Sequence, residues 1–389
     1  MALTTGPRSL VTQRQVRGMT AAALVLAVLT GVIVWFAGSD DRALDEACGG
    51  ALAADEVRTV LGDSGMDVTS GTEGTFGGDS SDSGSGGSSG SGNSGGSSLA
   101  VRCAVTAEGR GRVGVTIAGA PRPRAEHGTG ELYTAVPARD TLPVPIGHGW
   151  SGLLATDNAR QGDRGDGRAT AAVLLDCARG GRSLLITVET TLRGATLDDP
   201  ATRPSFVRTA IATARRADDR WNCGARLGKP VRGVGLPVNA DEYEPLLGAT
   251  GTCATVPTAA RSAVSTARET ARARAPREIC ALGARDGAPR YRLDAYYGPY
   301  AEDARAQYTR NGGEGVTPAD KPAGRLGRSA YWAGADCPDG ARRALYLIRA
   351  DDADGDARAR PDLGYERAAL SAFAARSAED HGCAAPVTP

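Results

Sequence analysis

The sequence predicts an α+β protein in which a single N-terminal transmembrane helix is followed by two tandem repeats, each an antiparallel sheet of about four strands packed with helices and held by two disulfides. Three observations lead to this fold class. An apolar run lies near the N-terminus, and the cysteines form two similar sets. Within each set, segments with alternating apolar residues, typical of strands, are followed by a long segment with helical periodicity. The eight cysteines are Cys48, Cys103, Cys177 and Cys223 in the first set and Cys253, Cys280, Cys337 and Cys383 in the second.

Residues 19–37 are predicted to be the transmembrane helix, because they are apolar apart from two threonines and small residues. As a helix this run reaches about 28 Å, which matches one bilayer core. Arg8, Arg14 and Arg17 precede the run and acidic residues follow it, so the positive-inside rule places residues 1–18 in the cytoplasm and the remainder outside. The alternative is a cleaved secretory signal peptide with its cleavage site at the small residues 37–39.

The predicted domain organisation follows from the apolar run and the cysteine sets. A Gly/Ser-rich tract, residues 71–98, lies within the first repeat and is predicted to be disordered. The tract accounts for the longer first cysteine interval of the first set, 55 residues against 27 in the second (103 − 48 and 280 − 253). The segments are a cytoplasmic tail (1–18), the transmembrane helix (19–37), a short juxtamembrane linker (38–47), the first extracytoplasmic repeat (48–228), a connection (229–252) and the second extracytoplasmic repeat (253–389).

An exported chain with an even number of cysteines is expected to pair all of them, because disulfides persist in oxidising compartments. The last two cysteines of each set are 46 residues apart (223 − 177 and 383 − 337). This equal spacing favours pairing within each repeat, although eight cysteines allow 105 connectivities. The expected bridges are Cys48–Cys103, Cys177–Cys223, Cys253–Cys280 and Cys337–Cys383.

In the first repeat, the pattern predicts a short helix, two hairpins and a long helix. Val113, Val115 and Ile117 alternate with smaller or polar residues, as in a strand with one buried face. Pro204 suits the first turn of a helix that runs to about Arg220. The expected ranges are helix 53–61, strands 99–107 and 112–118, strands 170–176 and 183–191, and helix 204–220.

The second repeat is predicted to follow the same order. A helix is expected from Pro257 to about Arg274, and the Asp286-Gly287 pair predicts a hairpin turn. A final helix ends near Gly382, since glycine is the usual residue just beyond a helix C-terminus. The expected strands are 278–282, 291–297, 329–335 and 344–350, and the final helix covers 363–379.

Three patterns resemble known binding motifs, but a simpler interpretation is favoured for each. Residues 109–114 fit G-x-G-x-x-G, yet a strand rather than a helix follows them, which predicts a hairpin turn. The tripeptide at 164–166, Arg-Gly-Asp, is interpreted as coincidence in a chain rich in these residues. Residues 350–361 resemble a calcium loop, but Ala350 and Pro361 occupy the first and twelfth ligand positions.

No catalytic, cofactor-binding or metal-ligating residue is predicted. The histidines, His127, His148 and His381, show no metal-ligand spacing, and no G-x-S-x-G nucleophile elbow occurs. Trp150 and Trp332 either line a ligand groove or anchor the core, and the core is favoured because tryptophan is mostly buried in small domains. Enzymatic activity is therefore the less favoured interpretation.

The predicted function is that of a membrane-anchored extracytoplasmic binding, sensing or scaffolding protein of a bacterial cell envelope. The chain has no net charge, so nucleic acid is not an expected partner. Expected partners are the membrane, through the N-terminal helix, and an envelope protein or small ligand, which a cleft between the repeats would accommodate. The alternatives are an extracytoplasmic hydrolase with a dispersed active site and a structural subunit of an envelope complex.

Overall fold

The fold is known from a computed structural model. It describes residues 42–63, 65–73, 99–120, 141–156, 166–178, 182–197, 199–311, 321–326, 330–338, 343–351 and 362–389. The predicted transmembrane run, 19–37, lies outside the described residues. Within the part of the chain that is described, no helix is both long and apolar enough to cross a membrane.

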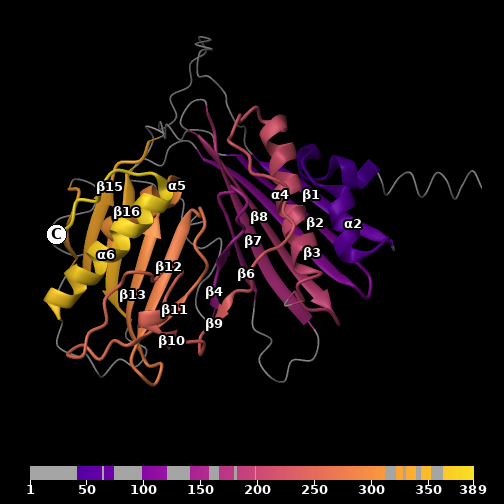
Figure 1. Ribbon diagram of the computed structural model, residues 1–389. Coiled ribbons are helices and arrows are strands. Elements are labelled where there is room, and N and C mark those ends of the chain that lie inside the picture. Colours follow the sequence, from indigo (N-terminus) through magenta and orange to yellow (C-terminus); the bar gives the residue numbers. More distant parts are fainter. Residues whose placement is uncertain are drawn as a thin grey trace, which may run out of the picture.

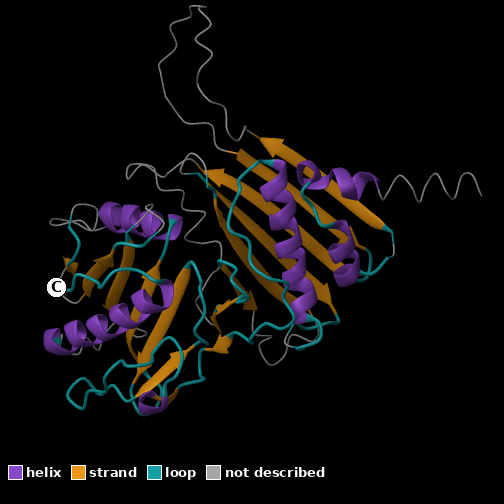
Figure 2. Ribbon diagram, turned by 45° about the horizontal axis from the view of Figure 1, so that its top comes forward, coloured by secondary structure: helices purple, strands orange, loops and turns teal. Residues whose placement is uncertain are grey.

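The first half of the chain forms a seven-stranded antiparallel sheet whose strand order is β1-β2-β3-β8-β7-β6-β5 (Figure 1). Its strands are β1 (Met66–Glu73), β2 (Leu99–Ala107), β3 (Gly111–Ala120), β5 (Val144–Pro145), β6 (Gly152–Thr156), β7 (Asp166–Asp176) and β8 (Ser183–Arg193). The short η1 (Ala47–Gly50), α2 (Ala54–Leu61) and the long α4 (Arg203–Arg220) complete this half. Figure 2 shows α2 and α4 side by side over one face of the sheet.

The second half forms another seven-stranded antiparallel sheet, with strand order β10-β11-β12-β13-β16-β15-β14. Its strands are β10 (Glu244–Pro245), β11 (Thr266–Glu269), β12 (Arg277–Gly283), β13 (Pro289–Tyr296), β14 (Gly324–Leu326), β15 (Ala330–Ala335) and β16 (Ala344–Ala350). Helix α6 (Leu363–His381) covers one face and α5 (Pro299–Asn311) covers the other (Figures 1 and 2). Between the halves, β4 (Thr141–Leu142) pairs with β9 (Val238–Asn239), and η2 (Leu246–Gly248) follows β10.

Six strands of the two sheets occupy corresponding places, because β1-β2-β3-β8-β7-β6 has the same connectivity as β11-β12-β13-β16-β15-β14. The register agrees as well: Cys103 of β2 lies opposite Val115 of β3, and Cys280 of β12 lies opposite Leu293 of β13. In each half, the corresponding strand, β7 or β15, is followed within two residues by a cysteine that bridges to the cysteine after the long helix. The bridges therefore fasten each long helix to its sheet.

All four disulfides join the cysteines that the sequence analysis paired. The α+β class and the antiparallel sheets are likewise confirmed. The strand count was underestimated, since each sheet has seven strands rather than about four. The missed strands are mostly at sheet edges and are short or polar. One of them, β1, includes residues 71–73, the first part of the Gly/Ser-rich tract.

The predicted helix from Pro257 to Arg274 is wrong. These residues form turns, an isolated bridge between Ala259 and Val264, and strand β11. Alanine and arginine favour helix, but that preference is weak and is readily overridden by tertiary contacts. Here β11 pairs with β12, and the Cys253–Cys280 bridge ties the preceding turn to the same strand.

Strands β1 and β2 pair along their full length, from Met66 opposite Ala107 to Glu73 opposite Ala100. The last residue of β1, Glu73, therefore lies beside the start of β2. The remainder of the Gly/Ser-rich tract, 74–98, lies outside the described residues.

Three apolar clusters hold the molecule together. The first lies between the first sheet and α2 and α4, and the second between the second sheet and α6. The third joins the halves, because it combines the opposite faces of both sheets with α5. Its larger members are Leu153, Leu174 and Leu185 from the first half and Tyr296, Tyr300, Trp332, Leu345 and Leu347 from the second. The halves consequently share one packed interface.

Candidate functional site

A cleft of about 550 Å³ lies at the boundary between the halves. Residues on its first wall include Ser151 and Ala225, and residues on its second wall include Ala275 and Pro299. It lies beside the third apolar cluster, since Leu174 and Ala275 belong to both. Because that cluster fixes the two halves against each other, the cleft is preformed.

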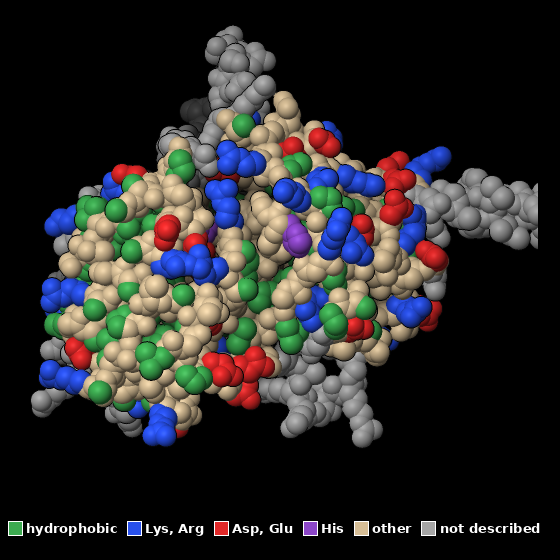
Figure 3. All heavy atoms as spheres, viewed as in Figure 1, with side chains coloured by type: hydrophobic (Ala, Val, Ile, Leu, Met, Phe, Trp, Pro, Cys, Tyr) green, Lys and Arg blue, Asp and Glu red, His purple; other side chains and the backbone are tan. Residues whose placement is uncertain are grey.

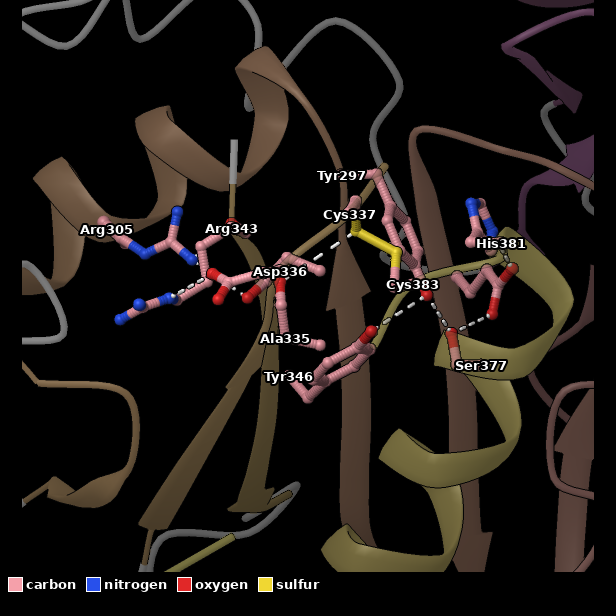
Figure 4. The surroundings of a disulfide bond; sticks show 12 residues. Tyr297, Arg305, Ala335, Asp336, Cys337, Arg343, Tyr346, Ser377, His381 and Cys383 are labelled. Atoms are coloured by element: carbon pink, nitrogen blue, oxygen red, sulfur yellow. Dashed lines mark hydrogen bonds and ion pairs between the residues drawn. A yellow bond between two sulfur atoms is a disulfide. The ribbon is translucent and has the colours of Figure 1, made fainter. Parts of the chain in front are cut away.

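Two corresponding disulfides border the cleft. Cys177, of the Cys177–Cys223 bridge, lines the first wall, and both members of the Cys337–Cys383 bridge line the second (Figure 4). Each bridge sits where a long helix ends against its sheet. The bridges therefore tie the chain to the sheet on both sides of the opening.

Charged side chains from both halves line the cleft. Arg226 comes from the segment after α4, and Arg274 comes from the segment before β12; both are exposed. Asp176 and His381 also line it. In Figure 3, lysine and arginine side chains gather around the upper part of the boundary between the halves.

A hydrogen-bonded network centred on Glu278 lies behind the second wall. Figure 4 shows its members Tyr297, Ser377 and His381. Nε2 of His381 lies 2.7 Å from Oε1 of Glu278, and the hydroxyl of Ser377 donates to Oε2 at 2.6 Å. The hydroxyl oxygens of Tyr297 and Ser377 are 2.5 Å apart. The ring of His381 stacks on that of Tyr297, with centroids 3.5 Å apart and planes 5° from parallel. The two rings that line the cleft are thereby fixed in orientation.

Burial raises the pKa of the Tyr297 hydroxyl well above its ordinary value, and nearby Tyr346 and Glu278 raise it further. The phenol is consequently protonated at neutral pH and can donate a hydrogen bond. The hydroxyl of Tyr346 lies 3.4 Å from that of Tyr297 and extends the network away from the cleft.

The network contains a serine, a histidine and a carboxylate, but they are not arranged for nucleophilic catalysis. A catalytic serine must be hydrogen-bonded to the histidine, which the carboxylate then orients. Here Glu278 lies between the other two and binds both. Ser377 is only 3% exposed, so it is not accessible to a substrate in the cleft. The arrangement supports the cleft wall rather than an acyl-transfer reaction.

The structure does not bring together the residues and motifs that the sequence singled out. Trp150 and Trp332 are both 1% exposed and anchor the core, as expected. His148 lies in an exposed turn, where Nε2 is 3.1 Å from the carbonyl oxygen of Gly233. The G-x-G-x-x-G pattern is a hairpin turn running into β3, as predicted. His127, most of the Arg-Gly-Asp tripeptide and most of the calcium-like loop lie outside the described residues.

Among the described residues, no group of three or more His, Cys, Asp or Glu side chains could hold a metal ion, and no cysteine is free. Sequence reasoning did not identify Glu278, Ser377 or Tyr297, because only the folded sheet and α6 bring them together. One signal was available: Glu278 begins the otherwise apolar run Glu278–Leu282, and a charge in such a strand needs a partner when it is buried.

Comparisons of the chain with protein-family models, with curated proteins and with solved structures give no match.

Proposed function

We propose that this protein is a non-enzymatic binding component of a bacterial cell envelope, and that its ligand occupies the cleft between the two halves. The single observation that carries the proposal is this cleft of about 550 Å³, built from both halves and bordered by two disulfides. Ligand sites are typically preformed clefts of about 300–1,000 Å³ at such boundaries.

The proposed location is outside the cytoplasmic membrane, with residues 19–37 as the anchor and residues 1–18 in the cytoplasm. Four disulfides support an oxidising compartment.

We also propose that residues 48–228 and 253–389 are copies of one ancestral unit. The shared strand order and the equivalent helix-to-sheet bridges support that duplication.

A hydrolase remains the second candidate, since serine, histidine and carboxylate do come together beside the cleft. Their order argues against it, because Glu278 separates Ser377 from His381. Binding is therefore the better-supported function.

The test is a thermal-shift screen of the full chain in detergent against amino acids, dipeptides, sugars and small organic acids and phosphates. The cleft is blocked in an Ala225→Trp variant, because Ala225 lines it, and Ala240→Trp at an exposed turn is the matched control. We expect at least one compound to raise the melting temperature of the wild type and of Ala240→Trp but not of Ala225→Trp. Equal stabilisation of Ala225→Trp, or no stabilisation by any compound, contradicts the proposal.

The proposed anchor has its own test. Alkaline carbonate extraction of bacterial membranes should leave the protein in the pellet with residues 1–37 intact by N-terminal sequencing. A soluble chain that begins near residue 40 would show instead that the run is a cleaved signal peptide.

A further inference from the structure

We infer that the ligand of the cleft carries an anionic oxygen group, a carboxylate or a phosphate, which Arg226 of the first half and Arg274 of the second half bind together. This inference rests on the proposed function and specifies the chemistry of its ligand.

Arg274 is the main observation. Other arginines near this wall have carboxylate partners: Arg272 pairs with Asp380, and Arg343 pairs with Asp336. Arg274 lines the cleft, is exposed, and has no ion pair or hydrogen bond with its side chain among the described residues. Its backbone is held in place, since the next three residues, 275–277, are buried and Tyr297 donates its N–H to the carbonyl of Pro276. A cation on a fixed support is thus presented to the cleft.

Arg226 supplies the second cation from the opposite half. It lies three residues after Cys223, whose bridge to Cys177 borders the cleft. Of the lining residues, Asp176 is the acidic one, so the cleft keeps a net positive charge from Arg226 and Arg274. A cleft lined by excess positive charge concentrates anions. One guanidinium group can donate two parallel N–H hydrogen bonds to two oxygens of a carboxylate or phosphate.

The remaining lining residues suit an organic ligand whose apolar or aromatic part carries the anionic group. Leu174, Pro299 and Pro338 provide apolar surface, and the stacked rings of Tyr297 and His381 provide a flat one. Gly224 and Gly298 also line the cleft and have positive φ of 65° and 54°. Glycine is favoured in this backbone conformation, and with no side chain it leaves space in the cleft. A small organic anion fits this combination better than an inorganic ion alone.

The test uses the full chain and two matched pairs of probes, N-acetylphenylalanine against its primary amide and phenyl phosphate against phenol. In each pair, one compound carries the anionic group and the other is its neutral counterpart. Comparing the affinities of the two anions distinguishes a carboxylate site from a phosphate site. Dissociation constants are measured by calorimetry for the wild type, Arg274→Gln, Arg226→Gln and the double variant. Arg232→Gln and Arg285→Gln are the controls, because both arginines are exposed and neither lines the cleft.

We expect one anion to bind at least about tenfold more tightly than its neutral partner, and Arg274→Gln to remove about tenfold of that affinity. The controls should leave the affinity unchanged, and added salt should weaken binding to the wild type. Equal binding of anion and neutral partner, or wild-type affinity in both cleft variants, overturns the inference. If a neutral or cationic compound instead binds and Ala225→Trp abolishes its binding, the cleft remains the ligand site and only the anionic ligand is wrong.

Discussion

Arg277 and Asp294 form an ion pair inside the second sheet, with Nε and Nη2 of Arg277 donating to Oδ1 of Asp294 at 3.2 and 2.9 Å. Asp294 is fully buried, and Arg292 and Arg349 lie against its other carboxylate oxygen. Burial by itself would raise the pKa of this carboxyl. The guanidinium groups of Arg292, Arg277 and Arg349 outweigh burial and lower the pKa to about 2.

The first prediction concerns acid stability. The pKa of Asp294 falls from 3.8 to about 2 on folding, so its stabilisation is complete above about pH 4 and is lost as the pH falls towards 2. The shift corresponds to about 2 kcal/mol. Asp294→Asn should lower the free energy of unfolding at pH 7 by about 3 kcal/mol, because it leaves buried arginines without their carboxylate. Urea denaturation from pH 7 to 2 should show a shallower acid loss in this variant than in the exposed control Asp241→Asn; parallel curves would contradict the assignment.

The second prediction separates stability from binding. Removing Cys48–Cys103 or Cys337–Cys383 by paired Cys→Ala substitutions should each cost about 4 kcal/mol, since the loops of 55 and 46 residues are of similar length. Only the second bridge lines the cleft. Its removal should therefore also weaken the binding of any compound found in the thermal-shift screen. Equal loss of binding in both variants would mean that the bridges act only through global stability.

The third prediction concerns the two buried tryptophans. Nε1 of Trp150 donates to the carbonyl of Lys229, Nε1 of Trp332 donates to that of Lys321, and a glycine lies against each indole ring. A Cβ atom added at Gly324 would overlap the ring of Trp332. Gly324→Ala should lower the free energy of unfolding by about 1–3 kcal/mol through overpacking. Gly114→Ala, where no atom lies within 4 Å of an added Cβ, should be neutral or slightly stabilising in the same denaturation assay; an equal loss there would refute the overpacking argument.

The fourth prediction addresses the packed interface between the halves. Tyr300 of α5 is 2% exposed, and its hydroxyl has no hydrogen-bond partner among the described residues. Tyr300→Phe should therefore preserve or raise the free energy of unfolding by up to about 1 kcal/mol. Tyr300→Ala should cost about 3–5 kcal/mol by opening a cavity. We expect calorimetry to show one unfolding transition for the wild type, because the third cluster couples the halves, and two for Tyr300→Ala. A single transition in Tyr300→Ala would show that other contacts couple them.

The parts of the fold that local chemistry dictates were predictable from the sequence. Strand β2 has the expected bounds, and Pro204 stands in the first turn of α4 as expected. Helix α6 ends where Gly382 adopts a left-handed conformation, with φ of 68°, and Asp362 caps its start by accepting from the N–H of Tyr365 at 3.1 Å. The pairing within each repeat that the cysteine spacing favoured, one of 105 possible connectivities, matches all four bridges.

The rest depends on contacts between distant segments. Helix α5 was missed because its sequence is polar along much of its length. Its apolar residues Tyr300, Ala301 and Ala304 hold it in the third cluster, where it packs on β13 and β16. The cleft was anticipated only as a general feature of paired repeats. Its network could not be predicted, since Glu278, Tyr297 and Ser377 come from two strand ends and a helix that meet only after folding.

The pairing of Glu73 with Ala100 has a practical use. Because neighbouring strands bracket positions 74–98, a fluorescent protein or an epitope whose own ends lie close together can be spliced there without changing the alignment of β1 and β2. Such a graft would make the molecule visible in living cells while leaving both long helices, every sulfur bridge and the opening between the halves untouched.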